Sequence, residues 1–193
     1  MSNHDKALAK VNTTFDETVE RILSVYDRAT DSQLEEGMQW YPLNGAWVVE
    51  TAHATGYSID TVAAVAAHLS PRIDWNILVP RISLFLANGA DKGLLKANVK
   101  LAKDAIVASD PLSTVKGKKT KAFAANLLGD LDAVTVDIWA LRVALPGKVK
   151  GTEPSLAGVH AALCDAYREA ASRRGITPPS MQAVTWVVIR GKA

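Results

Sequence analysis

The chain has 193 residues, of which 48% are hydrophobic and 22% charged, and its formal net charge is +2 at pH 7. That length suits one domain or two small lobes with a buried core, and a single cysteine, Cys164, excludes both a disulfide framework and a four-cysteine iron-sulfur cluster within the chain. Such a small charge does not mark a nucleic-acid-binding protein, so DNA affinity would depend on how the charges are placed.

No targeting pattern stands out in the sequence. Proline or arginine interrupts the longest apolar tracts, and the first ten residues lack the apolar core of a signal peptide. We therefore expect no membrane segment and a cytoplasmic location, associated with the nucleoid if the protein binds DNA.

The N-terminal part predicts a frayed start followed by a packing helix. Residues 1–12 are expected to be frayed. Thr14 and Glu17 have the spacing of a capping box, and apolar residues recur at helical spacing from there to Tyr26.

Two short helices are expected next, over residues 31–40 and 46–55. Between them, Tyr41-Pro42-Leu43-Asn44-Gly45 combines a proline with an Asn-Gly turn signal, which predicts an interruption. Gly56 is expected to end the second helix, and Ser58 to cap the helix that follows.

Two further helices are expected over residues 76–86 and 93–108. Pro80 lies inside the first, where it should bend the helix or mark its first turn because proline lacks a backbone donor. Asn88-Gly89 ends that segment, and Asp110-Pro111 breaks the second helix.

The stretch 115–145 places charged and glycine residues where they could serve chemistry. Lys116 to Thr120 form a cationic turn before an apolar helix that Gly129 ends. Backbone amides at the start of a helix attract phosphate, the more so with lysines beside them. Asp137 stands directly before the next apolar helix, in the position of an N-cap.

The remaining sequence completes an all-α protein. Residues 146–151 form a flexible basic loop, residues 155–174 an alanine-rich helix ended by Gly175, and Pro178-Pro179 opens a final helix. Since no strand-like alternation persists for more than a few residues, we expect about nine or ten helices.

The central stretch resembles the helix-hairpin-helix DNA glycosylase superfamily, of which endonuclease III is a member. The resemblance is carried by the glycine turn with lysine, the apolar helix, the short link and Val136-Asp137 opening another helix. Lys119 precedes Asp137 by 18 positions, which is the family's spacing between its lysine and its aspartate. Val115 stands where members usually have an earlier glycine, so the hairpin is degenerate, and Trp139 stands where many members carry a histidine.

This likeness covers about residues 58–191 and implies a two-lobed domain with a DNA groove between the lobes. One lobe would contain residues 1–57 and 146–193, and the other residues 58–145 with the hairpin. The four cluster cysteines of some branches are absent, so the iron-sulfur branch is excluded.

The resemblance assigns roles to eight residues. Asp137 would stabilise the positive charge that develops on the sugar when a base is removed, and Lys119 would attack the sugar to form a Schiff base. Arg72 takes the place of a glutamine that enters the DNA stack in the family, so it would fill the gap left by a flipped base. Contacts to DNA phosphates are expected from Lys116, Gly117, Lys118, Thr120 and Lys121.

Each of these residues also has an ordinary structural explanation. Asp137 would be a helix cap, Lys119 a phosphate-binding lysine in a solvated turn, and Arg72 a phosphate-contacting or salt-bridged surface arginine. Without the resemblance these explanations are the more frequent ones.

The expected function is base excision on double-stranded DNA by a DNA glycosylase, with or without AP-lyase activity, that needs neither metal nor cofactor. Three alternatives stay open. The protein would be an inactive DNA-binding or inhibitory partner that retains the fold, an enzyme of the same superfamily that modifies nucleobases, or a helical scaffold that does not bind DNA.

Overall fold

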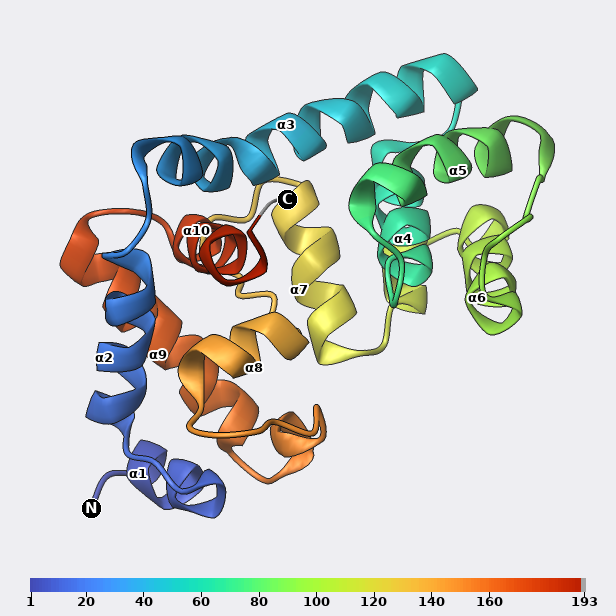
Figure 1. Cartoon of the computed structure of the whole chain (residues 1–193). Helices are drawn as coiled ribbons and strands as arrows, with labels where there is room; N and C mark the ends of the chain where they lie inside the picture. The colour runs from blue at the N-terminus through green and yellow to red at the C-terminus, as the bar shows by residue number, and fades with distance from the viewer. Residues whose placement is uncertain (192–193) are drawn as a thin grey trace. The chain divides into compact units, whose positions relative to one another are not determined.

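The structure is a computed structural model that describes residues 1–191. Within that range it has ten α-helices, three short 3-10 helices and no strand, which confirms the all-α prediction (Figure 1). The α-helices are α1 (Asn3–Leu8), α2 (Phe15–Tyr26), α3 (Asp31–Thr55), α4 (Ile59–Leu69), α5 (Trp75–Asn88), α6 (Lys96–Val107), α7 (Lys118–Leu127), α8 (Ile138–Ala144), α9 (Val159–Arg174) and α10 (Pro178–Arg190). The 3-10 helices are η1 (Ala9–Val11), η2 (Leu112–Thr114) and η3 (Glu153–Ser155). Of the helices described, none is both long and apolar enough to cross a membrane.

The chain divides into two compact units. The middle unit contains residues 42–130, and the terminal unit contains residues 1–41 together with the chain from residue 131 onward. Helix α3 contributes residues to both units, since it begins at Asp31 and ends at Thr55.

The expectation of a frayed N-terminus was wrong. Ser2 Oγ accepts a hydrogen bond from Asp5 N at 3.0 Å, and the Asp5 carboxylate accepts one from Ser2 N at 3.3 Å, so α1 begins with a complete capping box. Leu8 at its end is fully buried. The Ser-x-x-Asp spacing was the sequence signal for this helix.

The expected interruption at residues 41–45 was also wrong, because α3 is one helix of 25 residues with Pro42 inside it. Its two glycines allow close packing rather than turns. A β-carbon on Gly37 would lie 2.5 Å from Val184 Cα in the terminal unit, and one on Gly45 would lie 3.0 Å from the Leu127 carbonyl oxygen in the middle unit. Neighbouring backbones therefore approach this helix where no side chain stands in the way.

Most of the other predicted helix ends are confirmed. Thr14 and Glu17 cap each other's backbone amides, and Ser58 Oγ accepts a hydrogen bond from Thr61 N at 3.1 Å. Gly129 and Gly175 follow α7 and α9 in the left-handed conformation that favours glycine. Other ends moved by a few residues: α6 begins at Lys96 and α9 at Val159, and Pro80 lies inside α5 rather than in its first turn.

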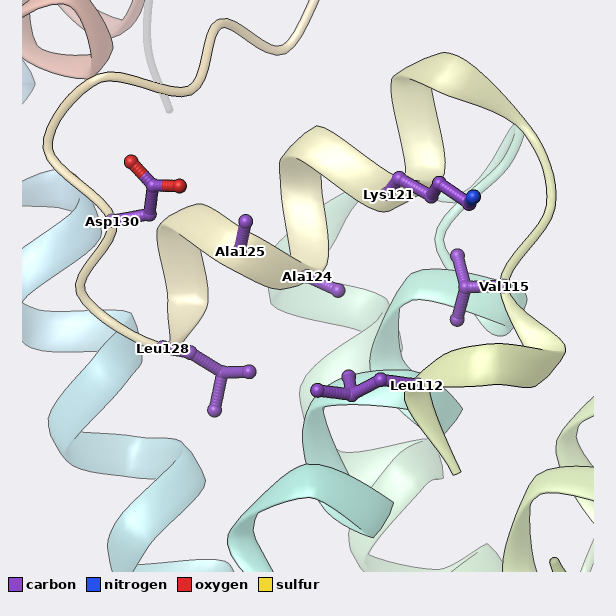
Figure 2. A pocket seen from close by; sticks show the side chains of 7 residues that line it. All are labelled: Leu112, Val115, Lys121, Ala124, Ala125, Leu128 and Asp130. Carbon is purple, nitrogen blue, oxygen red and sulfur yellow. The ribbon is translucent and has the colours of Figure 1, made fainter. Parts of the chain in front are cut away.

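The middle unit is built around α4, whose residues from Thr61 to Leu69 are all buried. Its run of small and β-branched side chains lets α5, α6, α7 and η2 pack against it. One face of α7 borders a hollow of about 400 Å³ that lies wholly within this unit (Figure 2).

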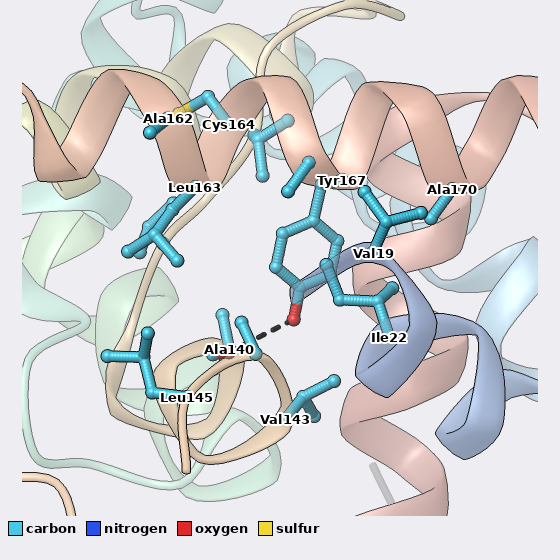
Figure 3. Close-up of a cluster of buried hydrophobic side chains, with 14 of the residues drawn as sticks. Val19, Ile22, Ala140, Val143, Leu145, Ala162, Leu163, Cys164, Tyr167 and Ala170 are labelled. Carbon is cyan, nitrogen blue, oxygen red and sulfur yellow. Dashed lines mark hydrogen bonds between the residues drawn. The ribbon is translucent and has the colours of Figure 1, made fainter. Parts of the chain in front are cut away.

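The terminal unit has its own core, which α1, α2, α8, α9 and α10 form together. Tyr167 of α9 is fully buried among aliphatic side chains such as Val19 and Ile22, and its hydroxyl donates a hydrogen bond to the Ala140 carbonyl oxygen at 3.1 Å (Figure 3). A buried hydroxyl requires such a partner, so this bond also fixes α8 against α9.

Candidate functional site

The cationic segment lies at the N-terminus of α7 in the middle unit. The expected turn was partly wrong, because the helix already begins at Lys118 and Gly117 is its N-cap. No side chain caps this end, and the Thr120 hydroxyl instead donates to the Gly117 carbonyl oxygen at 2.9 Å. The first amides of α7 therefore carry the partial positive charge of a helix N-terminus without an oxygen ligand from the N-cap side chain.

Three lysines of this segment are directed to solvent. Lys116, Lys118 and Lys121 are exposed, whereas Thr120 is half-buried. Exposed lysines next to helix amides that no N-cap side chain binds present the positive charge and the donors that phosphate binding uses.

Lys119 differs from its neighbours because it is half-buried and held by two contacts. Its Nζ donates a hydrogen bond to Ser70 Oγ at 3.1 Å and lies 4.7 Å from the centroid of the Phe123 ring. The ring face attracts the ammonium form of the amine. This contact also brings together two segments that the sequence places 49 residues apart, the end of α4 and the start of α7.

Arg72 lies in the short connection that joins α4 to α5. It is exposed, and its φ of +67° is in the left-handed region, which a residue with a β-carbon seldom adopts. Such a conformation costs on the order of 1 kcal/mol and is most often found at functional sites and tight turns. Since Ser70 of the same connection contacts Lys119, Arg72 and the cationic segment belong to one neighbourhood of the middle unit.

Aromatic rings behind Lys119 hold this neighbourhood in place. Trp75 lies edge-on to both Trp47 and Phe123, with ring centroids 5.5 Å apart in each pair. Its indole nitrogen donates a hydrogen bond to Asn44 Oδ1. The sequence did not predict that Lys119 contacts Ser70 and Phe123, because a lone serine after a helix and a lone phenylalanine within one give no signal of a contact with a lysine.

His68 is a packing residue that fixes η2 against α4. The single hydroxyl proton of Thr114 is donated to the Pro111 carbonyl oxygen at 2.6 Å, so His68 Nε2 must be the donor in its 2.9 Å contact with Thr114 Oγ1. Burial lowers the pKa of His68, and the more distant charge of Asp104 opposes this effect.

Asp137 caps α8 in the terminal unit, as the sequence predicted. Its Oδ1 accepts hydrogen bonds from Trp139 N at 3.0 Å and Ala140 N at 2.8 Å. Two backbone donors hold the side chain in one orientation. Burial raises the pKa values of Tyr41 and Tyr167, and the charge of Asp137 adds to the shift in both.

The eight predicted residues are thus divided between the two units. Seven belong to the middle unit, and Asp137 belongs to the terminal unit. Trp139, which follows Asp137, packs under Arg142, whose guanidinium carbon is 4.3 Å from the ring centroid. Among residues 1–191, no three His, Cys, Asp or Glu side chains gather in a group able to hold a metal ion.

Comparison with known proteins gives one family. The family described as "Family of unknown function (DUF7178)" matches residues 4–193, almost the whole length of the chain. No curated protein matches, and no solved structure matches, the helix-hairpin-helix glycosylases included.

Proposed function

Since the chain belongs to the DUF7178 family of unknown function, we propose from its own residues that it binds double-stranded DNA through the middle unit. The first turn of α7 and Arg72 would contact phosphates of the backbone. The observation that carries this proposal is the contact of Lys119 with Ser70, because it brings the cationic segment close to the connection that contains Arg72.

The charges and donors of the proposed DNA-binding surface suit a phosphate group. Lys116, Lys118, Lys121 and Arg72 are exposed, and the amides at the start of α7 have no side-chain cap. A phosphate bridges several such donors at once, and each neutralised phosphate releases counterions from the duplex. Lys119 would act as a fixed charge within the surface, because Ser70 and Phe123 already orient its ammonium group.

Duplex binding measured by fluorescence anisotropy at several salt concentrations tests this proposal. We expect Lys118→Gln and Arg72→Gln each to weaken binding and to reduce the slope of log K against log salt concentration by about 0.9. Lys103→Gln is the matched control, since Lys103 is an exposed lysine of α6 in the same unit. Equal effects of the three substitutions, or no salt-dependent binding by the unsubstituted protein, would contradict the proposal.

Base excision is the second candidate, and the geometry of Asp137 favours it. A carboxylate fixed by two backbone amides is preorganised to stabilise positive charge on a sugar. The protein would then be a DNA glycosylase of the helix-hairpin-helix type, with Asp137 essential. The contacts of Lys119 with Ser70 and with the Phe123 ring weigh against a lyase step, because the amine would have to leave both to attack a sugar.

A panel of duplexes separates binding from chemistry. Duplexes carrying uracil, oxidised pyrimidines, alkylated purines, mismatches or abasic sites are incubated with the protein, and borohydride is added to trap any imine. Base release that Asp137→Asn abolishes without loss of DNA affinity would support the enzyme. If the protein binds duplexes but releases no base, the hypothesis of a non-catalytic DNA-binding protein would be supported. If borohydride traps an imine and Lys119→Gln abolishes the trapping, the lyase step would be established.

A further inference from the structure

The hollow beside α7 has the size and the walls of a small-molecule site. It measures about 400 Å³, within the range of about 300–1,000 Å³ that is usual for ligand pockets. All of its lining residues belong to the middle unit. Two of them were singled out from the sequence: Lys121 was expected to contact phosphate, and Val115 stands where the resembled family usually has a glycine.

The hollow exists because one face of α7 carries small side chains. Lys121, Ala124, Ala125 and Leu128 follow the i, i+3, i+4, i+7 spacing that brings residues onto one face of a helix. The two alanines leave space that larger side chains would fill. Figure 2 shows the methyl group of Ala124 and the side chain of Leu128 directed toward this space.

The facing wall is apolar as well. Leu112 of η2 and Val115, the residue that follows η2, close the hollow on the side opposite α7 (Figure 2). Val115 is buried, but Leu112 and Leu128 are only half-buried. Covering apolar surface that is left in contact with water is favourable, so an apolar group is expected to bind here.

The charges at the rim define the other end of the ligand. Lys121 is exposed and lies next to Val115 at one end, and no acidic side chain among residues 1–191 pairs with it. Asp130 lines the other end, but in Figure 2 its carboxylate is directed away from Leu112 and Ala124. The site therefore offers one positive charge beside an apolar interior.

We propose that the hollow binds a small amphiphilic anion, with an alkyl chain or ring system between α7 and η2 and a carboxylate or other anionic group on Lys121. The second part of the inference rests on the proposed function: because Lys121 also belongs to the DNA-binding surface, such a ligand competes with phosphate and lowers DNA affinity. The hollow thus serves as a regulatory site next to the DNA contacts.

Octanoate and octan-1-ol are the probes that test this site, since they share an alkyl chain and differ in the anionic group. Binding is followed by amide chemical shifts in NMR titrations of the full chain. We expect saturable binding of octanoate, at least fivefold tighter than that of octan-1-ol, with shifts concentrated in η2 and α7.

Three variants separate the parts of the site. Lys121→Gln should weaken octanoate at least fivefold and change octan-1-ol binding less than twofold. Lys118→Gln is the matched control, because it removes the same charge from α7 outside the hollow, and it should leave both probes within twofold. Ala124→Leu should abolish binding of both probes, provided that circular dichroism shows a folded protein; the Lys121 variant decides the question if it does not.

Several outcomes would overturn the inference. The role of Lys121 would be contradicted if octanoate bound no more tightly than octan-1-ol. It would also be contradicted if the Lys118 and Lys121 variants weakened octanoate binding equally. Competition with DNA is tested separately. Octanoate should release a labelled duplex from the unsubstituted protein but not from the Lys121→Gln variant. If no duplex binds while the octanoate results hold, the proposed function fails and the ligand site stands; if duplex binds and octanoate does not displace it, the regulatory part fails.

Discussion

Replacing Gly37 by alanine tests the close contact between α3 and α10. An added β-carbon would lie 2.5 Å from Val184 Cα and 2.7 Å from Val184 N, whereas ordinary contacts begin near 3.4 Å. Both of these atoms belong to the backbone, so rotation of a side chain does not relieve the overlap. The helices must move apart, and the packing around Val184, which is fully buried, would loosen.

The expected loss of stability follows from two opposing effects. Alanine is favoured over glycine inside a helix by about 0.5–1 kcal/mol. Overpacking of a well-packed contact costs about 1–3 kcal/mol, and a backbone overlap belongs at the upper end of that range. The net destabilisation should therefore be about 1–2 kcal/mol.

Urea unfolding followed by circular dichroism at 222 nm, the usual signal of helix content, measures this change as a lower midpoint at unchanged slope. Gly45→Ala is the matched control, because Gly45 lies in the same helix and its added β-carbon would meet one carbonyl oxygen at 3.0 Å. There the gain in helix propensity and the mild overlap should cancel to within about 0.5 kcal/mol. A Gly37→Ala protein as stable as the unsubstituted one would refute the reasoning.

Three further predictions concern groups in the two cores. Asp137→Ala should lower the free energy of unfolding by about 1 kcal/mol while Asp137→Asn, which retains the cap, changes it by only a few tenths; equal losses in urea unfolding would contradict the capping role. Burial raises the pKa values of Tyr41 and Tyr167, so their hydroxyls stay un-ionised in the folded protein at a pH where they ionise in the unfolded chain. The free energy of unfolding should therefore fall above the unfolded pKa of about 10, by about 1.4 kcal/mol per pH unit for each tyrosine. Tyr41→Phe should remove one of these two contributions, as unfolding between pH 9 and about pH 11 would show, and an unchanged slope would count against burial of an un-ionised hydroxyl. Burial lowers the pKa of His68, so as the pH falls the unfolded chain takes up a proton at this histidine before the folded protein does. The free energy of unfolding should therefore decrease below about pH 6.5. His68→Gln should flatten this pH dependence, and a dependence that persists in the variant would have to come from another group.

Local signals in the sequence predicted much of the helical pattern. The Thr14–Glu17 capping box, the Ser58 and Asp137 caps and the glycine stops could be read because each depends on residues three or four positions apart. The turn predicted at residues 41–45 was wrong because proline and the Asn-Gly pair are typical of turns. The reason for a glycine inside this helix is the backbone of α7 close to Gly45, which no local pattern reveals.

The candidate site was predictable only in part, for the same reason. The lysines around Gly117 are adjacent in the sequence, so their clustering was visible. The contacts of Lys119 with Ser70 and of His68 with Thr114 join residues 49 and 46 positions apart, and no local pattern encodes them. The hollow beside α7 depends on what two alanines leave unfilled, which becomes visible only when η2 is placed opposite them.

The residue at the N-cap of α7, Gly117, affects both the stability of the helix and the donors at its start. Gly117 has φ −69° and ψ 138°, angles that serine or aspartate adopts as readily as glycine, so the backbone does not require a glycine at this position. An added β-carbon would lie 2.9 Å from Thr120 Oγ1, so the Thr120 hydroxyl would have to turn away. A serine or aspartate there would then supply a capping side-chain oxygen and would strengthen the helix at its start. The same oxygen would occupy the donors that an incoming anion needs. Under the proposed function, a serine or aspartate at this position should therefore stabilise α7 and at the same time weaken phosphate binding.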